Sequence, residues 1–285
     1  MKTSVDMLTE FRTFLEKENV APRTQRAYEA DVIAFVHWFE TTTGESFDPA
    51  ALTRREMLDW REAMLKSSKP ASVNRRLCSL RAFFDWAILK GLVSIDPTRR
   101  LRGVKVAWDH SQAPTDDTIE RILQQARLAG NLRDRAILEL MAATGLHVHE
   151  LAGLRGADLE LGPTSASVTV ANEKTGGSRR VPVSVRARAV LREYLETRGE
   201  IPAGQPLFPS RLGKPVSPYT IWYLVKKYAG LAGVEAVSPR NFREAAALRL
   251  LRDPQMDLST AATLLGHIHP ESSVHYLQTR EKIEP

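Results

Sequence analysis

The chain has 285 residues, which is enough for about two domains at ~150 residues per domain. Hydrophobic residues make up 43% and charged residues 26%, which excludes a disordered or collagen-like chain. No apolar run reaches the ~18–20 residues of a membrane span, and the acids Asp6 and Glu10 argue against a signal peptide. The single cysteine, Cys78, excludes an internal disulfide and a multi-cysteine zinc site, so we expect a cytoplasmic protein.

The net charge is +6, and the positive surplus is concentrated in one stretch. Residues 61–105 hold 11 lysines and arginines against three acids, Glu62, Asp85 and Asp96. Such a local surplus is typical of a surface that binds a polyanion, and nucleic acid is the simplest such partner. A solvated basic face without a ligand is the alternative.

The first hundred residues predict a bundle of four amphipathic helices. Apolar residues recur at helical spacing over 5–15, and further patterns begin at Pro22, after Thr53 and over 70–91. We interpret Cys78, in the fourth of these helices, as a small core residue.

Residues 103–114 lose the helical periodicity and mix Gly, Pro and polar residues, which predicts a linker. Two short strands around Thr175-Gly176-Gly177, over 168–172 and 179–183, predict a β-hairpin. Helices are predicted on either side of the hairpin, near 116–129, 132–143, 148–153, 184–197, 218–232, 241–252, 257–265 and 270–278. No glycine-rich phosphate loop or dinucleotide fingerprint occurs, so we expect no nucleotide cofactor.

Several motifs follow one another in a fixed order along the chain. In the first half, a T-x3-Y-x2-D-x3-F-x2-W pattern runs from Thr24 to Trp38, and SVNRRLCSLRAFFDWAILKGLVSIDP follows at 72–97. The second half contains, in order, ATGLHVHELAGL (143–154), EKTGGSRRVPV (173–183), SPRNFREAAALRLL (238–251) and LLGHIHPESSVHY (264–276). In this order and spacing they resemble the motifs of the tyrosine recombinases, the family of phage integrases, Cre and the Xer recombinases. The resemblance covers nearly the whole chain.

This resemblance implies a mainly α-helical fold with a small β-hairpin or sheet in the catalytic domain. It implies a two-domain clamp around DNA, with a helical, SAM-like core-binding domain over 1–105, a linker over 106–114 and a catalytic domain over 115–285. The implied activity is that of a site-specific recombinase or integrase, which cuts and rejoins DNA strands through a 3′-phosphotyrosine.

The resemblance also assigns roles to individual residues. Tyr276, nine residues after His267, would be the nucleophile. Arg243 and His267 would bind the scissile phosphate, and Lys174 would protonate the leaving 5′-oxygen. Guanidinium groups suit a phosphate transition state because they are always charged and bind oxygens in pairs. We therefore expect no metal and no other cofactor, since cations of the protein would neutralise the charge.

Two positions depart from the family pattern. His147 stands where the first motif of the second half (143–154) has an arginine after Thr-Gly-Leu in the family, and Arg240 stands where the motif over 238–251 has a histidine, three residues before Arg243. Arg240 can still donate to a phosphate oxygen. A neutral imidazole at His147 offers one donor, which predicts a rate lower by about 10²–10³ and a partial gain toward pH 6, near its usual pKa of ~6.5. Glu150, one helical turn on, is interpreted either as orienting His147 or Arg243 or as an exposed acid.

The basic stretch predicts contacts to DNA phosphates, with affinity that falls steeply as salt rises. The candidate contacts are Arg75, Arg76, Arg81, Arg99, Arg100, Arg102 and Lys105. Because recombination joins two sites, the resemblance implies a homotetramer assembled on double-stranded DNA, with no membrane partner.

Two other functions are compatible with the same motifs. A DNA-binding accessory protein that no longer cleaves is favoured by His147. A type IB topoisomerase would share the chemistry without needing a specific site, but the N-terminal pattern argues against it. A helical scaffold with no role on nucleic acid would leave the ordered motifs unexplained.

Overall fold

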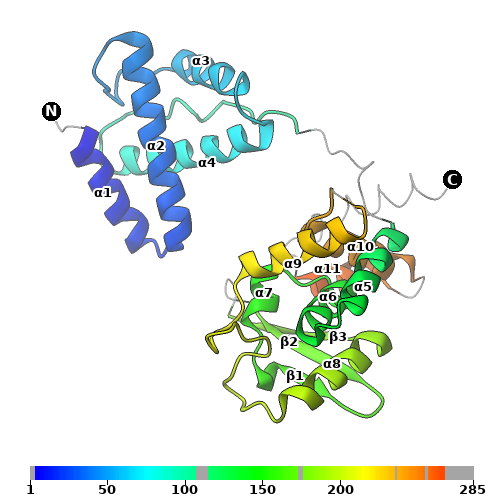
Figure 1. The fold of residues 1–285 in the computed structure, drawn as a ribbon. Coiled ribbons are helices and arrows are strands. Elements are labelled where there is room, and N and C mark those ends of the chain that lie inside the picture. The colour runs from blue at the N-terminus through cyan, green and yellow to red at the C-terminus, as the bar shows by residue number, and fades with distance from the viewer. Residues whose placement is uncertain (1–3, 107–114, 173–175, 235, 254–255, 267–285) are drawn as a thin grey trace. The chain divides into compact units, whose positions relative to one another are not determined.

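The computed structural model describes residues 4–106, 115–172, 176–234, 236–253 and 256–266 (Figure 1). The chain divides into two compact units, Met1–Trp108 and Asp109–Pro285, and each is described by itself. Within the described ranges, no helix is both long enough and apolar enough to cross a membrane.

The described part of the first unit is a bundle of four helices, as the sequence predicts (Figure 1). They are α1 (Ser4–Lys17), α2 (Pro22–Thr43), α3 (Arg54–Leu65) and α4 (Pro70–Leu89). Pro22 and Pro70 each open a helix, where a missing backbone N–H costs nothing. Thr53 and Glu56 form a capping box at the start of α3, in which the Glu56 carboxylate accepts from the Thr53 N–H at 2.8 Å.

Aromatic side chains dominate the core of this unit. Phe11 of α1 meets Phe83 of α4 edge to face at 5.4 Å, and Phe35 of α2 meets Trp60 of α3 in the same way at 5.7 Å. Such pairs contribute about 0.5–1.5 kcal/mol each beyond the area they bury. The aromatic contacts therefore help to join all four helices into one core.

Cys78 lies on the outer side of α4 and is exposed. Its neighbours Leu77, Ser79 and Leu80 are buried, and a step of one residue rotates a helix by about 100°, which turns position 78 toward solvent. The interpretation of Cys78 as a core residue is therefore wrong.

In the second unit, the predicted helices between 116 and 265 are confirmed to within two residues at each end. They are α5 (Asp116–Leu128), α6 (Leu132–Thr144), α7 (Val148–Gly153), α8 (Val185–Arg198), α9 (Pro218–Leu231), α10 (Pro239–Arg252) and α11 (Leu258–Leu265). The helix predicted near 270–278 lies outside the described residues. Helix α6 is buried along its length and contacts α5, α8, α9 and α10, so it is the centre of this unit (Figure 1).

A three-stranded antiparallel sheet occupies one side of the described second unit (Figure 1). Its order is β1 (Leu159–Leu161), β2 (Ala166–Ala171) and β3 (Ser178–Pro182). The β2–β3 hairpin is the predicted one, with Val170 opposite Arg179 and Thr169 opposite Arg180. Strand β1 is not among the predicted elements, because three residues are too short to show a period. The observed architecture confirms the mainly α-helical fold class with a small sheet.

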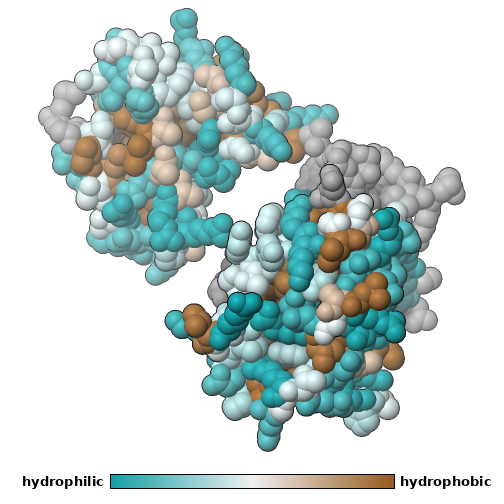
Figure 2. Space-filling view, viewed as in Figure 1, coloured by the Kyte–Doolittle hydropathy of each residue, from teal (hydrophilic) through white to brown (hydrophobic). Residues whose placement is uncertain are grey.

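The visible surface of both units is mostly hydrophilic, and the apolar residues on it form small separate groups (Figure 2). The exposed large apolar side chains include Leu89, Ile95 and Leu212. Isolated apolar residues of this kind are normal on soluble proteins and carry no functional argument.

Candidate active site

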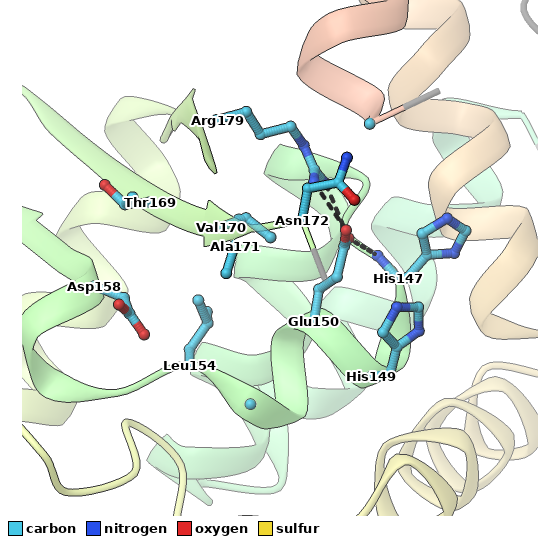
Figure 3. A pocket seen from close by; sticks show the side chains of 12 residues that line it. His147, His149, Glu150, Leu154, Asp158, Thr169, Val170, Ala171, Asn172 and Arg179 are labelled. Carbon is cyan, nitrogen blue, oxygen red and sulfur yellow. Dashed lines mark hydrogen bonds and ion pairs between the residues drawn. The ribbon is translucent and has the colours of Figure 1, made fainter. Parts of the chain in front are cut away.

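A pocket of about 270 Å³ lies where α7, the adjoining ends of β2 and β3, and the end of α11 meet (Figure 3). Its polar lining is formed by His147, His149, Glu150, Asp158, Thr169, Asn172 and Arg179. The lining draws on three of the motifs, because residues of the first motif, the hairpin and the last motif all contribute to it.

The turn after α6 brings the first motif to the pocket. Gly145 ends α6 in the left-handed region at φ +64°, and its N–H donates to the Met141 carbonyl at 2.9 Å. A Cβ at this position would lie 3.0 Å from the Ala246 Cβ and 3.2 Å from a Leu265 methyl. Glycine is required here both by the backbone angle and by the close approach of α10 and α11.

His147 begins α7 at the edge of the pocket. Its backbone N–H donates to Glu150 Oε2 at 2.8 Å, and its ring stacks on that of His149 with centroids 5.2 Å apart (Figure 3). Desolvation by the surrounding protein and the charge of Arg243 lower the pKa of His147 to about 4, although the Glu150 carboxylate opposes the shift. His147 is therefore neutral at pH 6 in the DNA-free protein, which argues against the expected gain in rate from its protonation near pH 6.

Arg243 connects the motif over 143–154 to the motif over 264–276. It lies on α10 and is only 5% exposed. Its Nη1 donates to the Gly145 carbonyl at 2.9 Å, and its Nη2 donates to the Leu265 carbonyl at 2.6 Å. The predicted phosphate ligand is thus a buried cation between the turn before His147 and the end of α11.

Arg240 lies one helical turn before Arg243 and is directed to solvent. Its side chain is 62% exposed, and its Nε donates to Glu244 Oε1 at 2.9 Å on the same helix. Arg240 is not among the residues that line the pocket. The structure therefore does not bring this predicted site residue to the pocket lining.

Glu150 points into the pocket and pairs with Arg179 of β3 (Figure 3). The two Nη atoms of Arg179 donate to the two carboxylate oxygens at 2.8 and 2.9 Å, while its Nε donates to the Leu264 carbonyl at 3.0 Å. The interpretation of Glu150 as an exposed acid is wrong, because its side chain is 11% exposed. Its contact with the His147 N–H is compatible with a role in orienting His147, which stays a prediction.

The Glu150 carboxylate stays ionised at neutral pH. Burial by itself would raise its pKa, but the hydrogen bonds from Arg179 and from the His147 N–H outweigh burial and hold the pKa below the usual value. The pocket thus contains a fixed negative charge that is matched by the guanidinium of Arg179.

Arg179 is not among the site residues predicted from the sequence, although strand geometry indicates it. Side chains alternate along a strand, so Arg179 shares a face with Val181, which is buried, while Arg180 has the opposite face. A charged residue on the buried face of a short strand indicates a partner in the core.

Three predicted catalytic residues, Lys174, His267 and Tyr276, lie outside the described residues. In the sequence, Lys174 falls between β2 and β3. Gly266, which ends α11 and lines the pocket, directly precedes His267.

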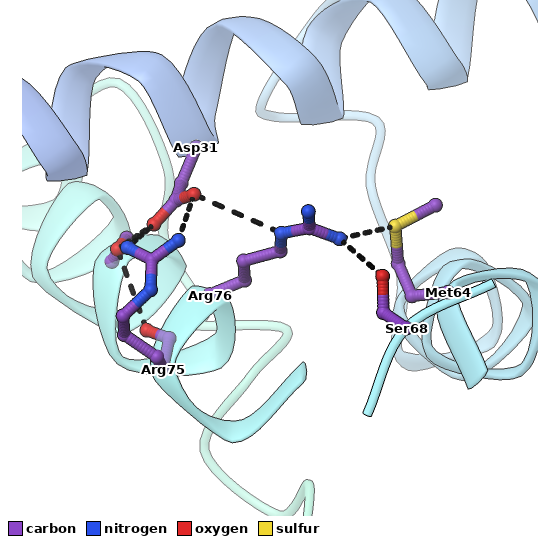
Figure 4. A network of polar contacts seen from close by, with 6 residues as sticks. Asp31, Met64, Ser68, Arg75 and Arg76 are labelled. Atoms are coloured by element: carbon purple, nitrogen blue, oxygen red, sulfur yellow. Dashed lines mark hydrogen bonds and ion pairs between the residues drawn. The ribbon is translucent and has the colours of Figure 1, made fainter. Parts of the chain in front are cut away.

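In the first unit, a buried carboxylate holds two of the predicted DNA contacts (Figure 4). Asp31 of α2 accepts from both Nη atoms of Arg75 and from the Ser79 hydroxyl, and Arg76 Nε lies 3.9 Å from it. Arg76 Nη1 also donates to Ser68 Oγ at 3.1 Å. The Arg75 and Arg76 side chains nevertheless remain 49% and 30% exposed, so both are available at the surface.

The other predicted DNA contacts lie on α4 and in the segment that follows it. Arg81 donates to the Leu101 carbonyl at 2.6 Å and is partly buried. The exposed members are Arg99, Arg100, Arg102 and Lys105. Asn74 of α4, which is not among the predicted residues, pairs with both backbone groups of Val104 at 2.7 and 2.8 Å and so fixes this segment against α4.

Comparison with known proteins matches both units. The family model described as "Phage integrase family" matches residues 114–282, and that described as "Phage integrase, N-terminal SAM-like domain" matches residues 8–91. The chain belongs to the phage integrase family of tyrosine recombinases. The family membership predicted from the motifs is thereby confirmed. Enzymes of this family cut and join DNA strands.

Two curated relatives of this phage integrase family member are bacterial tyrosine recombinases. The XerD protein of Ralstonia nicotianae is 31% identical over 258 residues, which is 88% of this chain and 82% of the relative. The XerC protein of Xylella fastidiosa is 32% identical over 280 residues, 92% of this chain and 88% of the relative. Among solved structures, a lambda integrase tetramer bound to a Holliday junction matches with a TM-score of 0.74 at 19% identity, over 96% of this chain and 77% of that chain.

Proposed function

We propose that the chain is a site-specific DNA recombinase that cuts and rejoins strands through a 3′-phosphotyrosine formed by Tyr276. The observation that carries the proposal is the pocket between α7, the hairpin and α11, where segments of three motifs converge next to the buried Arg243. Membership of the phage integrase family supports the same activity.

In the proposed cleavage step, the phenol oxygen of Tyr276 attacks the scissile phosphorus and the bond to the 5′-oxygen breaks. The phenol releases one proton to solvent and the 5′-oxygen gains one from Lys174, which is then protonated again from solvent, so no proton is consumed overall. In the rejoining step, a 5′-hydroxyl attacks the phosphotyrosine and releases the phenol. Neither step needs water or a nucleotide as a reactant.

The proposed phosphate ligands are Arg243, His267 and His147, and Arg240 would join them only by turning away from Glu244 toward the phosphate. Arg243 carries a permanent charge, which favours the additional negative charge of the transition state. His147 is neutral at physiological pH, so it contributes one hydrogen bond in place of a guanidinium. This donor set predicts a slow enzyme, because losing one strong donor to a transition-state oxyanion lowers a rate by about 10²–10³.

The proposed partner is double-stranded DNA, held by the second unit at the scissile phosphate and by the first unit through its basic segment. Four copies would assemble on two sites, as in the lambda integrase tetramer on a Holliday junction. The relatives are bacterial, and bacterial chromosomes lie in the cytoplasm, so the cytoplasm is the proposed site of action.

The test is a nicked suicide duplex that carries the target site, which traps the covalent intermediate because the cleaved fragment diffuses away. The parent protein is expected to form an adduct that survives denaturation, and Tyr276→Phe is expected to form none. Tyr223→Phe, at an exposed tyrosine of α9, is the control and should form the adduct at the parent's rate. An adduct that persists in Tyr276→Phe would refute the assignment of the nucleophile.

A second candidate function is an accessory protein that binds the same DNA without cutting it. The specific observation in its favour is His147, whose neutral imidazole replaces a charged donor. Sequence-specific binding by the parent without any adduct would support this function over the recombinase.

A further inference from the structure

Arg179 connects three separate segments around the pocket, and Figure 3 shows its pair with Glu150. Its backbone pairs β3 with β2 opposite Val170, its two Nη atoms bind Glu150 of α7, and its Nε binds the Leu264 carbonyl at the end of α11. These segments come from three different motifs of the sequence.

The contacts of Arg179 are enclosed. The Arg179 and Glu150 side chains are only 10% and 11% exposed. A Cβ built on Gly266 would lie 2.6 Å from the Arg179 Cζ, so the guanidinium packs directly against the backbone at the end of α11. A bidentate, shielded pair of this kind holds its two elements in one geometry more firmly than an exposed ion pair does.

The next residue, Arg180, provides a contrast on the same strand. It pairs with Glu160 and donates to Ser167 Oγ at 2.7 Å, so it connects β3 only to the sheet that contains it. The Arg180 and Glu160 side chains are 64% and 57% exposed. Arg179 and Arg180 therefore carry the same charge and lie on the same strand, but the Arg179 side chain is largely buried and that of Arg180 is exposed.

We propose that Arg179 is a positioning residue, which fixes the β2–β3 hairpin against α7 and the end of α11. This inference rests on the proposed function, because it assigns Arg179 a part in the cleavage reaction. Arg179 acts through the segments that it holds and not by contact with DNA, since both of its Nη atoms bind the Glu150 carboxylate, which neutralises the charge of the guanidinium.

The consequence concerns proton transfer. Lys174, the proposed proton donor, lies five residues before Arg179 in the same hairpin sequence. Displacing a reacting group by about 1 Å can reduce a rate by ~10²-fold. A hairpin released from α7 and α11 should therefore deliver its proton poorly, while the binding of the phosphate should change less.

The experiment compares Arg179→Gln with Arg180→Gln as its matched control, on two suicide substrates. One substrate is ordinary DNA, and the other has a bridging 5′-sulfur, which leaves without needing a proton. At saturating protein, Arg179→Gln is expected to lose about 10²-fold in single-turnover rate on ordinary DNA and only a few-fold on the sulfur substrate. Arg180→Gln is expected to match the parent on both, and Arg179→Lys to recover little, because an ammonium lacks the planar fork.

A second readout does not depend on cleavage chemistry. A lysine-specific protease recognises the Lys174–Thr175 bond, and proteolysis is faster where a segment is released from its contacts. Arg179→Gln is expected to be cut there about ten-fold faster than Arg180→Gln under native conditions. Equal proteolysis of the two variants, or an equal loss of rate on both substrates, would overturn the proposal.

Failure of the proposed function gives a different pattern. In that case the parent forms no adduct that depends on Tyr276, on either substrate. The proteolysis comparison still decides whether Arg179 holds the hairpin.

Discussion

In both units, arginines are bound by acceptor groups of the protein, but Arg75 of the first unit stays exposed, whereas the arginines at the pocket of the second unit are largely buried. In the first unit, Asp31 binds Arg75, which stays 49% exposed. In the second unit, Glu150 binds Arg179, which is 10% exposed, and two backbone carbonyls bind Arg243, which is 5% exposed. The same chemistry thus presents charge at the surface of one unit and assembles a pocket in the other. Substitutions in the first unit should therefore change DNA affinity, and those in the second should change the rate of cleavage.

The largest effect is expected for Arg243→Lys. A lysine keeps the charge but cannot bind the Gly145 and Leu265 carbonyls with one planar fork, so the turn and the end of α11 lose their common anchor. The single-turnover rate of adduct formation should fall by about 10²–10³, with little change in DNA affinity. Arg249→Lys, at a 41% exposed side chain on the same helix, is the control and should stay near the parent. A large loss of affinity with an unchanged rate would contradict this division of roles between the units.

A smaller effect is expected from the exposed basic segment. The double variant Arg99→Gln/Arg100→Gln should flatten the plot of log affinity against log salt by about 0.9 for each phosphate that is no longer bound, or up to ~1.8 in total. The cleavage rate at saturating protein should not change. The measurement is a salt titration of binding, with Lys17→Gln, outside the basic segment, as the control. An unchanged slope would show that this segment does not face DNA.

Arg75→Ala/Arg76→Ala should flatten the same slope, but it also leaves the buried Asp31 carboxylate without its guanidinium partner. Removing one partner of a buried pair destabilises the fold. We therefore expect this variant to unfold at a lower denaturant concentration than Arg99→Gln/Arg100→Gln, and a denaturant titration checks the difference.

The smallest effect concerns pH. Because the pKa of His147 is about 4, acidification from pH 7.5 to 6 should change the cleavage rate of the parent and of His147→Gln in the same way. The unfolded chain takes up the proton near the usual pKa of ~6.5, so the contribution of His147 to stability should fall as the pH drops from about 6.5 toward 4. Parallel pH profiles of rate and of unfolding check both statements. A gain on acidification that disappears in His147→Gln would contradict the low pKa.

Features that depend on local chemistry could be predicted from the sequence. Proline at the start of α2 and α4 and glycine at the end of α6 mark helix ends, because each acts through its own backbone angle. The exposure of Cys78 depends on which side of α4 it occupies, and apolar spacing alone does not resolve this, since a small residue fits either side of a helix.

Features that depend on distant residues could not be predicted. The pKa of His147 depends on Arg243, which is 96 positions later, and the partner of Arg179 is Glu150, which is 29 positions earlier. Strand alternation could have placed Arg179 on the buried face of β3, but not its contact with α11. The motifs located the site along the chain, and the fold determined which of their residues meet.

The most direct test of the pocket as the phosphate site is His147→Arg. A guanidinium at the start of α7, beside the pocket, should stabilise the transition state far better than a neutral imidazole does. The measurement is the single-turnover rate of adduct formation on the nicked suicide substrate at saturating protein. We predict a rise of about 10²-fold or more, with DNA affinity nearly unchanged. A variant no faster than the parent would contradict the assignment of this pocket to the scissile phosphate.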